Sequence, residues 1–417
     1  MRRHLPVLFV AAALVGFIAL FFSRPPPPVI IPGPLARPAL SLLAPAPDWR
    51  ALDIYQNAIT RTEFERLLTD VFTTGPAWRT FIVLDDAEAR IQTGDSVYLL
   101  RFGQGNSAPR HWRATSELPP AAAGQPLSGL RIAIDPGHIG GAWAKMEERW
   151  FIVGEGTPVQ EGDMTLQVAK LLKPRLEALG ATVSLVRETT EPVTPIRPEL
   201  LLTTAGDNSK LAERLFYRTA EIRARADLVN LTLKPDLVLC LHFNAEAWGD
   251  PHQPTLIDRT HFHLILNGAY NDDEVLLADQ RFSLLRKLLQ RTHAEEVLVG
   301  STVAATFAEI SGLPPYVYPP DSKNALPVPG EPFLWVRNLI ANRLYDCPVI
   351  FMEPYVMNST LDHARIQAGD YDGLREISGI NRPSIFREYA DALSAGLARH
   401  YGSRPVLELK TAPADDR

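Results

Sequence analysis

Four side chains that can bind a metal or move a proton stand beside predicted strand ends or a helix start. They are His138 after the strand 131–134, His242 near the end of the strand 236–243, Glu353 directly after the strand 348–352, and Glu161 just before a helix that starts near Asp163. In open α/β sheets, the carboxyl ends of the strands form the edge at which binding sites lie. The sequence therefore predicts that these four residues converge.

Two imidazoles and one carboxylate are typical of a catalytic zinc site, because three protein ligands leave a fourth position open for water. A further carboxylate can act as general base on that water. Taken singly, a histidine at a strand end is more often structural, and a glutamate before a helix usually remains solvated and favours the helix dipole. Only the joint placement of the four residues points to a metal hydrolase.

Other acidic residues and histidines compete for these roles. Glu147, Glu148 and Glu155 are rivals of Glu161, but they lack a helix start that would hold a ligand rigidly. His261 and His263 alternate along a predicted strand and share one face, a spacing that can bind a metal. No third ligand lies near them in the sequence, so we expect solvated or cleft-lining histidines.

Four segments resemble the zinc-dependent N-acetylmuramoyl-L-alanine amidase family of the amidase_3 type. These segments are Ile134–His138, Glu161–Leu166, Leu239–Ala245 and Val349–Glu353, within a resemblance that runs from Leu130 to about Arg399. The resemblance implies that His138, Glu161 and His242 bind Zn²⁺ and that Glu353 is the catalytic carboxylate. It also implies that the substrate is peptidoglycan, cleaved at the amide between N-acetylmuramoyl and L-alanine.

The sequence departs from the family pattern around these residues. Ile139 follows His138 where the family usually has glycine, Gly162 replaces a usual lysine, and Pro354 follows Glu353 instead of a small residue. The loop 139–160 is also long. These differences concern substrate fit more than metal binding. They leave two alternatives: a zinc amide hydrolase acting on another peptide or amino-sugar amide, and a wall-binding protein without catalysis.

From residue 130 onward, short apolar runs alternate with amphipathic helical patterns, which predicts an α/β fold with a mostly parallel sheet flanked by helices. The predicted helices are 163–179, 213–230 and 274–296. A small α+β module precedes this part, with a helix after Thr60 and strands at 80–84 and 96–100.

The predicted organisation has six parts. They are a signal or membrane anchor at 1–23, a proline-rich linker at 24–47, the α+β module of unknown role at 48–113, a linker at 114–129, the catalytic domain at 130–400, and a loose tail at 401–417.

The N-terminus carries the localisation prediction. Arg2 and Arg3 precede an apolar run from Leu5 to Phe22, which is typical of an export signal. No small-residue cleavage site follows directly. We therefore expect an uncleaved anchor that attaches the chain to the membrane and places the rest on the periplasmic or cell-envelope side, with a cleaved signal peptide as the alternative.

Charge and cysteine content limit the partners. A net charge of −6 provides no basic field, so we expect no nucleic-acid partner. Cys240 and Cys347 lie in or beside apolar runs, and we expect them to be buried free thiols. A disulfide between the two is the alternative if the chain is exported. A regulatory protein and the oligomeric state are also left open.

Overall fold

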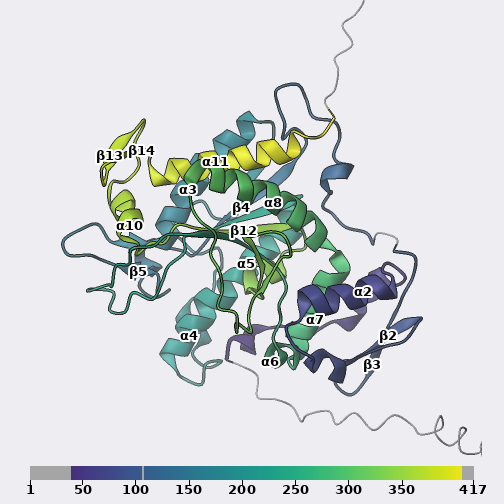
Figure 1. Ribbon diagram of the computed structural model, residues 1–417. Coiled ribbons are helices and arrows are strands. Elements are labelled where there is room, and N and C mark those ends of the chain that lie inside the picture. Colours follow the sequence, from purple (N-terminus) through teal and green to yellow (C-terminus); the bar gives the residue numbers. More distant parts are fainter. Residues whose placement is uncertain (1–38, 106–107, 406–417) are drawn as a thin grey trace, which may run out of the picture. The chain divides into compact units, whose positions relative to one another are not determined.

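A seven-stranded sheet lies at the centre of the fold in this computed structural model, which describes residues 39–105 and 108–405 (Figure 1). In spatial order the strands are β10 (Leu326–Pro327), β11 (Leu334–Val336), β9 (Phe262–Leu266), β12 (Val349–Pro354), β8 (Leu237–Leu241), β4 (Arg131–Pro136) and β7 (Thr182–Leu185). The strands β7, β4, β8 and β12 are parallel to one another, while β9 pairs antiparallel with β12. The predicted fold class, a mostly parallel sheet flanked by helices, is confirmed.

Alternation along the buried strands assigns side chains to the two faces of the sheet. Ile132 and Ile134 of β4 belong to the main core cluster, whereas Ala133 between them belongs to a second cluster on the opposite face. In β8, Leu239 and Cys240 divide in the same way. Both faces are apolar because helices cover both, as expected for parallel strands.

Two separate sets of helices cover the two faces of the sheet (Figure 1). On one face, α11 (Ile385–Tyr401) packs between α3 (Glu161–Ala178) and α8 (Thr292–Ser311). On the other face lies a continuous helical run of α4 (Ser209–Leu215), α5 (Glu221–Asp227) and two π-helical turns, η8 (Phe216–Ala220) and η9 (Leu228–Leu233). There α5 packs against α9 (Ile340–Leu344), which also contacts α7 (Ala278–Gln290).

The predicted helices at 163–179 and 213–230 are present with shifted ends, whereas the single helix predicted at 274–296 is wrong. The chain there forms α6 (Asp272–Val275), α7 and α8, and Arg291 between the last two adopts a left-handed conformation with φ of +56°. Arg291 donates to the Glu63 carboxylate at 3.0 Å and to the Gly105 carbonyl at 3.1 Å. These tertiary hydrogen bonds stabilise the interruption between α7 and α8, which hydrophobic periodicity does not reveal.

The part before the sheet contains a helix and a three-stranded antiparallel sheet. Its elements are η1 (Ala39–Leu43), η2 (Trp49–Tyr55), α2 (Arg61–Leu67), η3 (Leu68–Phe72), η4 (Ala77–Thr80), β1 (Ile82–Leu84), β2 (Glu88–Gln92) and β3 (Val97–Arg101). The Thr60 side chain accepts from the Glu63 N–H at 3.2 Å and so caps the helix that was expected after Thr60. Phe64 and Ile91 belong to the same core cluster as the central strands. A separate module at 48–113 and the other predicted boundaries remain proposals.

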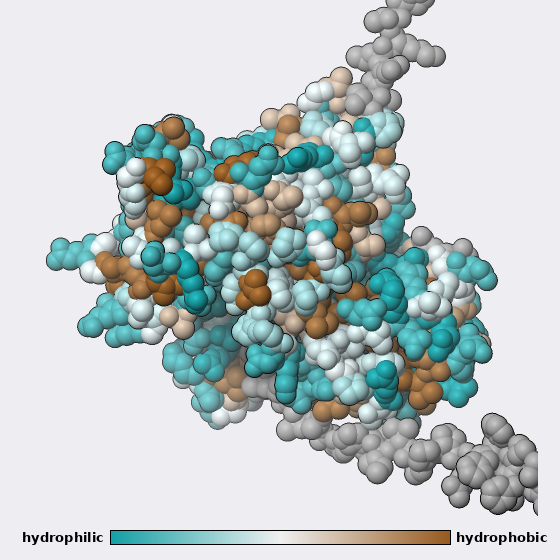
Figure 2. Space-filling model, viewed as in Figure 1, coloured by the Kyte–Doolittle hydropathy of each residue, from teal (hydrophilic) through white to brown (hydrophobic). Residues whose placement is uncertain are grey.

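The remaining elements are short or lie at the periphery. They are η5 (Thr115–Glu117), η6 (Gly141–Trp143), β5 (Trp150–Phe151), β6 (Val159–Gln160), η7 (Pro198–Leu201), α10 (Thr360–Gln367), β13 (Arg375–Ile377) and β14 (Ile380–Arg382). On the face drawn in Figure 2, hydrophobic residues form small separate groups among hydrophilic ones. That face therefore offers no single large apolar surface.

The localisation prediction requires correction. The segment 1–23, on which it rested, lies outside the described residues. Among the residues that are described, no helix is long and apolar enough to cross a bilayer. Even α8, with 20 residues, carries Glu295, Glu296 and Glu309, and a span needs about 20 predominantly apolar residues. The anchored placement on the periplasmic or cell-envelope side is therefore withdrawn.

The two cysteines agree with the simpler expectation. Cys240 and Cys347 are both buried free thiols. Burial raises the pKa of both thiols, so they remain protonated and pack as small apolar groups.

Candidate metal centre and active site

His138, Glu161 and His242 meet at the carboxyl edge of the sheet. Their potential ligand atoms all lie within 4.8 Å of one another. His138 Nε2 is 3.2 Å from Glu161 Oε2, and His242 Nδ1 is 3.0 Å from Glu161 Oε1. Tetrahedral zinc with bonds of about 2.0–2.1 Å separates neighbouring ligand atoms by about 3.3 Å, so these spacings suit one ion.

Adjacent parallel strands and one helix position these three residues. His138 follows β4, His242 follows β8, and the two strands pair directly, with Pro136 opposite Leu241. Glu161 is the first residue of α3, and its Oε1 accepts from the Phe243 N–H at 3.2 Å. The His242 N–H donates to the Met352 carbonyl of β12 at 3.1 Å, so three central strands share in positioning the site.

Two glycines permit the close approach of these segments. A Cβ on Gly137 would lie 2.3 Å from Cε1 of His242, inside the imidazole ring's contact distance. A Cβ on Gly162 would lie 2.3 Å from the Gly140 nitrogen. The departure at Gly162 therefore has a physical reason, because in this chain the start of α3 packs directly on the turn after His138.

The backbone around His138 is held from two sides. His138 has a φ of +58°, which is unfavourable for a residue with a Cβ. Its carbonyl accepts from Arg225 Nη2 at 2.8 Å. On the other side, the Glu147 carboxylate accepts from the N–H groups of Ile139 and Gly140 at 2.9 and 3.0 Å. These contacts stabilise a strained turn that presents the imidazole to the site.

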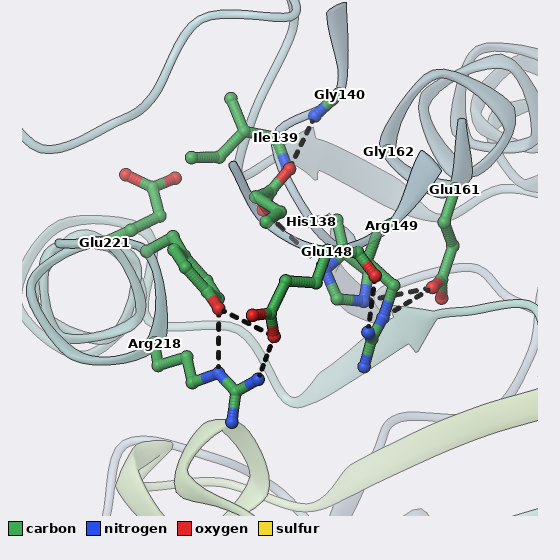
Figure 3. A network of polar contacts seen from close by, with 12 residues as sticks. His138, Ile139, Gly140, Glu148, Arg149, Glu161, Gly162, Arg218 and Glu221 are labelled. Atoms are coloured by element: carbon green, nitrogen blue, oxygen red, sulfur yellow. Dashed lines mark hydrogen bonds and ion pairs between the residues drawn. The ribbon is translucent and has the colours of Figure 1, made fainter. Parts of the chain in front are cut away.

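Glu147, considered above as a rival ligand, lies behind His138. Its Oε1 is 3.6 Å from His138 Nδ1, on the side of the ring away from Glu161. A carboxylate behind a metal-binding histidine selects its tautomer and orientation. Glu148 points elsewhere and pairs with Arg218 at 3.0 Å (Figure 3), while Glu155 is exposed.

The local electrostatics favour a cation between the three residues. Burial lowers the pKa of His138, but the carboxylates of Glu161 and Glu147 outweigh it and raise that pKa to about 9. Burial raises the pKa of Glu161, yet the two histidines bring it well below its usual value. A buried carboxylate that faces two imidazoles is thus held as an anion, as a metal ligand must be.

Arg149 adds a guanidinium that sequence reasoning missed. Figure 3 shows it directed toward Glu161, with Nε 3.3 Å from Oε2. It comes from the long loop 139–160, just before β5. Arg225 was missed as well, because it lies within a helix whose apolar periodicity gives no indication of a buried charge.

Glu353 lies at the end of β12 and faces the same cavity as the three residues. This cavity of about 380 Å³ is also lined by Arg149, Arg337 and the segment 243–248. Burial, followed by the negative charge of Glu161, raises the pKa of Glu353 to about 8. A carboxyl group with a pKa near neutrality can both take up and release a proton. The larger cavity of about 590 Å³, between α2 and the α7–α8 region, contains none of these groups.

His263 of β9 and His261 just before it form no second centre among the described residues. His263 lies opposite Glu353 in the β9–β12 register and contacts the Tyr318 hydroxyl at 3.2 Å. His261 is 3.4 Å from Glu246. Within the described ranges, the one group of three or more potential ligands is that of His138, Glu161 and His242. Both side chains are buried, with 6% of His261 and 2% of His263 exposed, and neither lines the cavity of the metal centre, so the expectation of solvated or cleft-lining histidines is not confirmed.

Comparison with known proteins identifies one family. Residues 132–256 match the model of Amidase_3, N-acetylmuramoyl-L-alanine amidase. The matched stretch contains His138, Glu161 and His242 and ends before Glu353. No curated protein matches the chain significantly.

Among solved structures, the chain is similar to several amidases. The N-acetylmuramyl-L-alanine amidase Ami1 from Mycobacterium smegmatis is 18% identical, with a TM-score of 0.37, over 67% of this chain and 99% of that one. An N-acetylmuramoyl-L-alanine amidase from Clostridium difficile 630 is 15% identical, with a TM-score of 0.39, over 66% and 97%. AmiC2 of Nostoc punctiforme is 15% identical, with a TM-score of 0.37, over 66% and 99%.

Proposed function

Residues 132–256 belong to the N-acetylmuramoyl-L-alanine amidase family, and on that premise we propose a zinc-dependent reaction at the edge of the central sheet. The chain hydrolyses the amide between N-acetylmuramoyl and L-alanine in peptidoglycan. His138, Glu161 and His242 hold the zinc ion, and Glu353 is the catalytic carboxylate.

The donor set suits zinc rather than a hard cation. Two imidazole nitrogens and one carboxylate oxygen are typical of catalytic zinc sites, whereas calcium and magnesium prefer oxygen ligands. Glu147 behind His138 supplies the outer carboxylate that such sites commonly have. When bound, zinc would act as a Lewis acid toward the scissile carbonyl.

Glu353 performs the proton transfers. It takes a proton from the attacking water and then delivers it to the departing amine nitrogen of L-alanine, because an amine is a poor leaving group until it is protonated. The raised pKa of Glu353, about 8, suits both steps. Its side chain is partly buried and lines the cavity that also contains His138 and Glu161, so it can reach a water molecule placed between them.

The observation that carries the proposal is the convergence of four residues from four separate segments on one cavity. Structural histidines and solvated glutamates would have no reason to meet in this way. The convergence involves the types of group that amide hydrolysis needs: three zinc ligands and a proton carrier.

Product analysis tests the reaction. Purified full-length chain, loaded with zinc, is incubated with peptidoglycan, and the soluble products are identified by mass spectrometry. We expect intact stem peptides with a free L-alanine amine, together with glycan that has lost its peptides. Release of disaccharide peptides or of cleaved stem peptides alone would contradict the assignment.

Two variants separate metal binding from proton transfer. Glu353→Gln should retain zinc by elemental analysis and lose at least about 100-fold in kcat, because general acid–base catalysis contributes about 10²–10⁴-fold. His138→Ala should lose both zinc and activity. If Glu353→Gln hydrolyses peptidoglycan at the normal rate, the proton carrier is a different group.

A further inference from the structure

A second cavity opens from the metal centre on the side of α5 and α9. It has a volume of about 450 Å³, within the range of small-ligand sites, and it is lined by His138 and His242 at one end. The two cavities share four residues: His138, Arg149, His242 and Arg337. A scissile bond held at the metal centre would lie beside His138 and His242, so the two halves of a substrate could extend into different cavities.

The wall of the second cavity carries three arginines without a carboxylate ion pair among the described residues: Arg223 of α5, Arg337 after β11 and Arg343 of α9. Arg343 Nη1 donates to the neutral oxygens of Gln280 and Asn338 at 2.8 and 2.9 Å. Arg337 reaches only the Tyr318 hydroxyl, at 3.4 Å. The Nε of Arg223 is buried without a hydrogen-bond partner.

Acidic residues in the same wall are already engaged or are too few to neutralise the arginines. Glu221 and Asp135 pair with the buried Arg225, and Glu274 caps the Asn271 N–H of α6. Asp279 acts on Arg223 only through space. Burial, followed by the like charge of Arg343, lowers the pKa of Arg223, and the negative charges of Asp279 and Asp227 offset this only in part.

We propose that this arginine-lined cavity binds the free carboxylate of the peptide half of the substrate. The inference rests on the proposed amidase function. A peptide carries at least its own C-terminal carboxylate, whereas the sugar half is neutral once its carboxyl group is in the scissile amide. Guanidinium groups bind carboxylates through paired, charge-assisted hydrogen bonds.

The proposal also sets the direction of the substrate. At its 243–248 end the first cavity contains Glu246, which disfavours an anionic peptide, together with Trp248, whose ring suits the face of a sugar. The glycan therefore lies toward 243–248 and the peptide toward α5 and α9. Specificity for peptides with a free carboxylate follows from this arrangement.

Paired substrates test the inference. The zinc-loaded full-length chain is assayed on a muramyl peptide with a free C-terminal carboxylate and on the same compound as its C-terminal amide. We expect kcat/KM to favour the carboxylate by about tenfold or more, since a hydrogen bond to a charged group contributes on this scale. Arg223→Gln and Arg343→Gln should each reduce this ratio toward one. The matched control Arg214→Gln removes an exposed arginine that pairs with Glu148 outside the cavity, and it should keep the ratio.

A binding measurement separates this inference from the proposed function. Calorimetry with the released peptide and its C-terminal amide reports the carboxylate preference without any turnover. If the chain cleaves both substrates equally, or if both arginine variants keep the full preference, the inference is overturned while the amidase function stands. If the chain cleaves neither substrate yet binds the carboxylate peptide in an Arg343-dependent way, the proposed reaction fails while the anion site stands.

Discussion

Replacing Arg225 by methionine should disrupt both the stability of the fold and the metal centre. Arg225 is buried, with 4% of its side chain exposed, and makes four hydrogen bonds. It donates to the carboxylates of Glu221 and Asp135 at 2.7 and 2.9 Å, and to the carbonyls of Pro136 and His138 at 2.7 and 2.8 Å. Methionine has a similar volume and can replace none of these donors.

The magnitude follows from the two carboxylates that lose their partner. Removing one member of a buried ion pair costs about 3–5 kcal/mol, because the remaining charge stays desolvated. Each carboxylate left without Arg225 can instead take up a proton, which costs about 4 kcal/mol at pH 7 for an ordinary carboxyl group. The loss of stability from the two carboxylates together therefore cannot exceed about 8 kcal/mol. We therefore expect a loss of about 3–5 kcal/mol in the free energy of unfolding. The His138 carbonyl also loses its donor, so zinc affinity should fall about tenfold or more.

Urea denaturation followed by circular dichroism measures the first effect, and competition with a chromophoric chelator measures the second. Arg214→Met is the matched control, since Arg214 is about half exposed and pairs only with the exposed Glu148. It should change stability by less than about 0.5 kcal/mol. A loss below about 1 kcal/mol in Arg225→Met, with unchanged zinc affinity, would refute the reasoning that this network supports the site.

Three further predictions concern the surroundings of the site. Glu147→Gln should weaken zinc binding about 10–100-fold in chelator competition, because the outer carboxylate behind His138 is lost, and equal affinity would show that Glu147 only supports the turn. Gly162→Ala should destabilise the fold by about 1–3 kcal/mol in urea, although alanine normally favours a helix, because its Cβ would lie 2.3 Å from the Gly140 nitrogen, and a stabilised variant would contradict this clash. For Asp236, burial raises the pKa but hydrogen bonds from Arg131 and Arg113 lower it from 3.8 to about 2. Because the pKa of Asp236 is lower in the folded chain than in the unfolded chain, its carboxylate stabilises the fold at every pH above about 4. Asp236→Asn should therefore lower the free energy of unfolding by about 2 kcal/mol at pH 7, and its difference from the unmodified chain should vanish as the pH falls from about 4 to about 2. A difference that does not depend on pH would exclude this linkage.

Local patterns predicted the central strands of the sheet, because burial on both faces imposes continuous apolar runs, but they did not predict the short strands β10 and β11. The strand expected at 236–243 is β8, which covers only 237–241, and the strand expected at 348–352 is β12, which begins at 349 and continues to 354. Strand order could not be predicted from these runs. The antiparallel insertion of β9 beside β12 depends on how α6, α7 and α8 return the chain, and apolar periodicity does not encode that path.

The candidate site was predictable in part because its residues directly follow strand ends or begin a helix. His138, Glu161 and His242 are brought together as expected, and the roles assigned to them and to Glu353 remain proposals. Glu147 was considered as a rival ligand to Glu161, and only the path of the loop 139–160 shows that it lies behind His138. Arg149 gave no signal, because an arginine in a polar loop is ordinarily solvated.

The sequence by itself determined which segments become buried strands and which ligand types stand at their ends, since both are local properties of the chain. Tertiary structure alone decided that Arg225 supports His138 from another element and that Arg223, Arg337 and Arg343 face one cavity. The physical reason is that the energy of a buried charge depends on partners far away in the sequence. Those partners are chosen by packing and leave no trace in local periodicity.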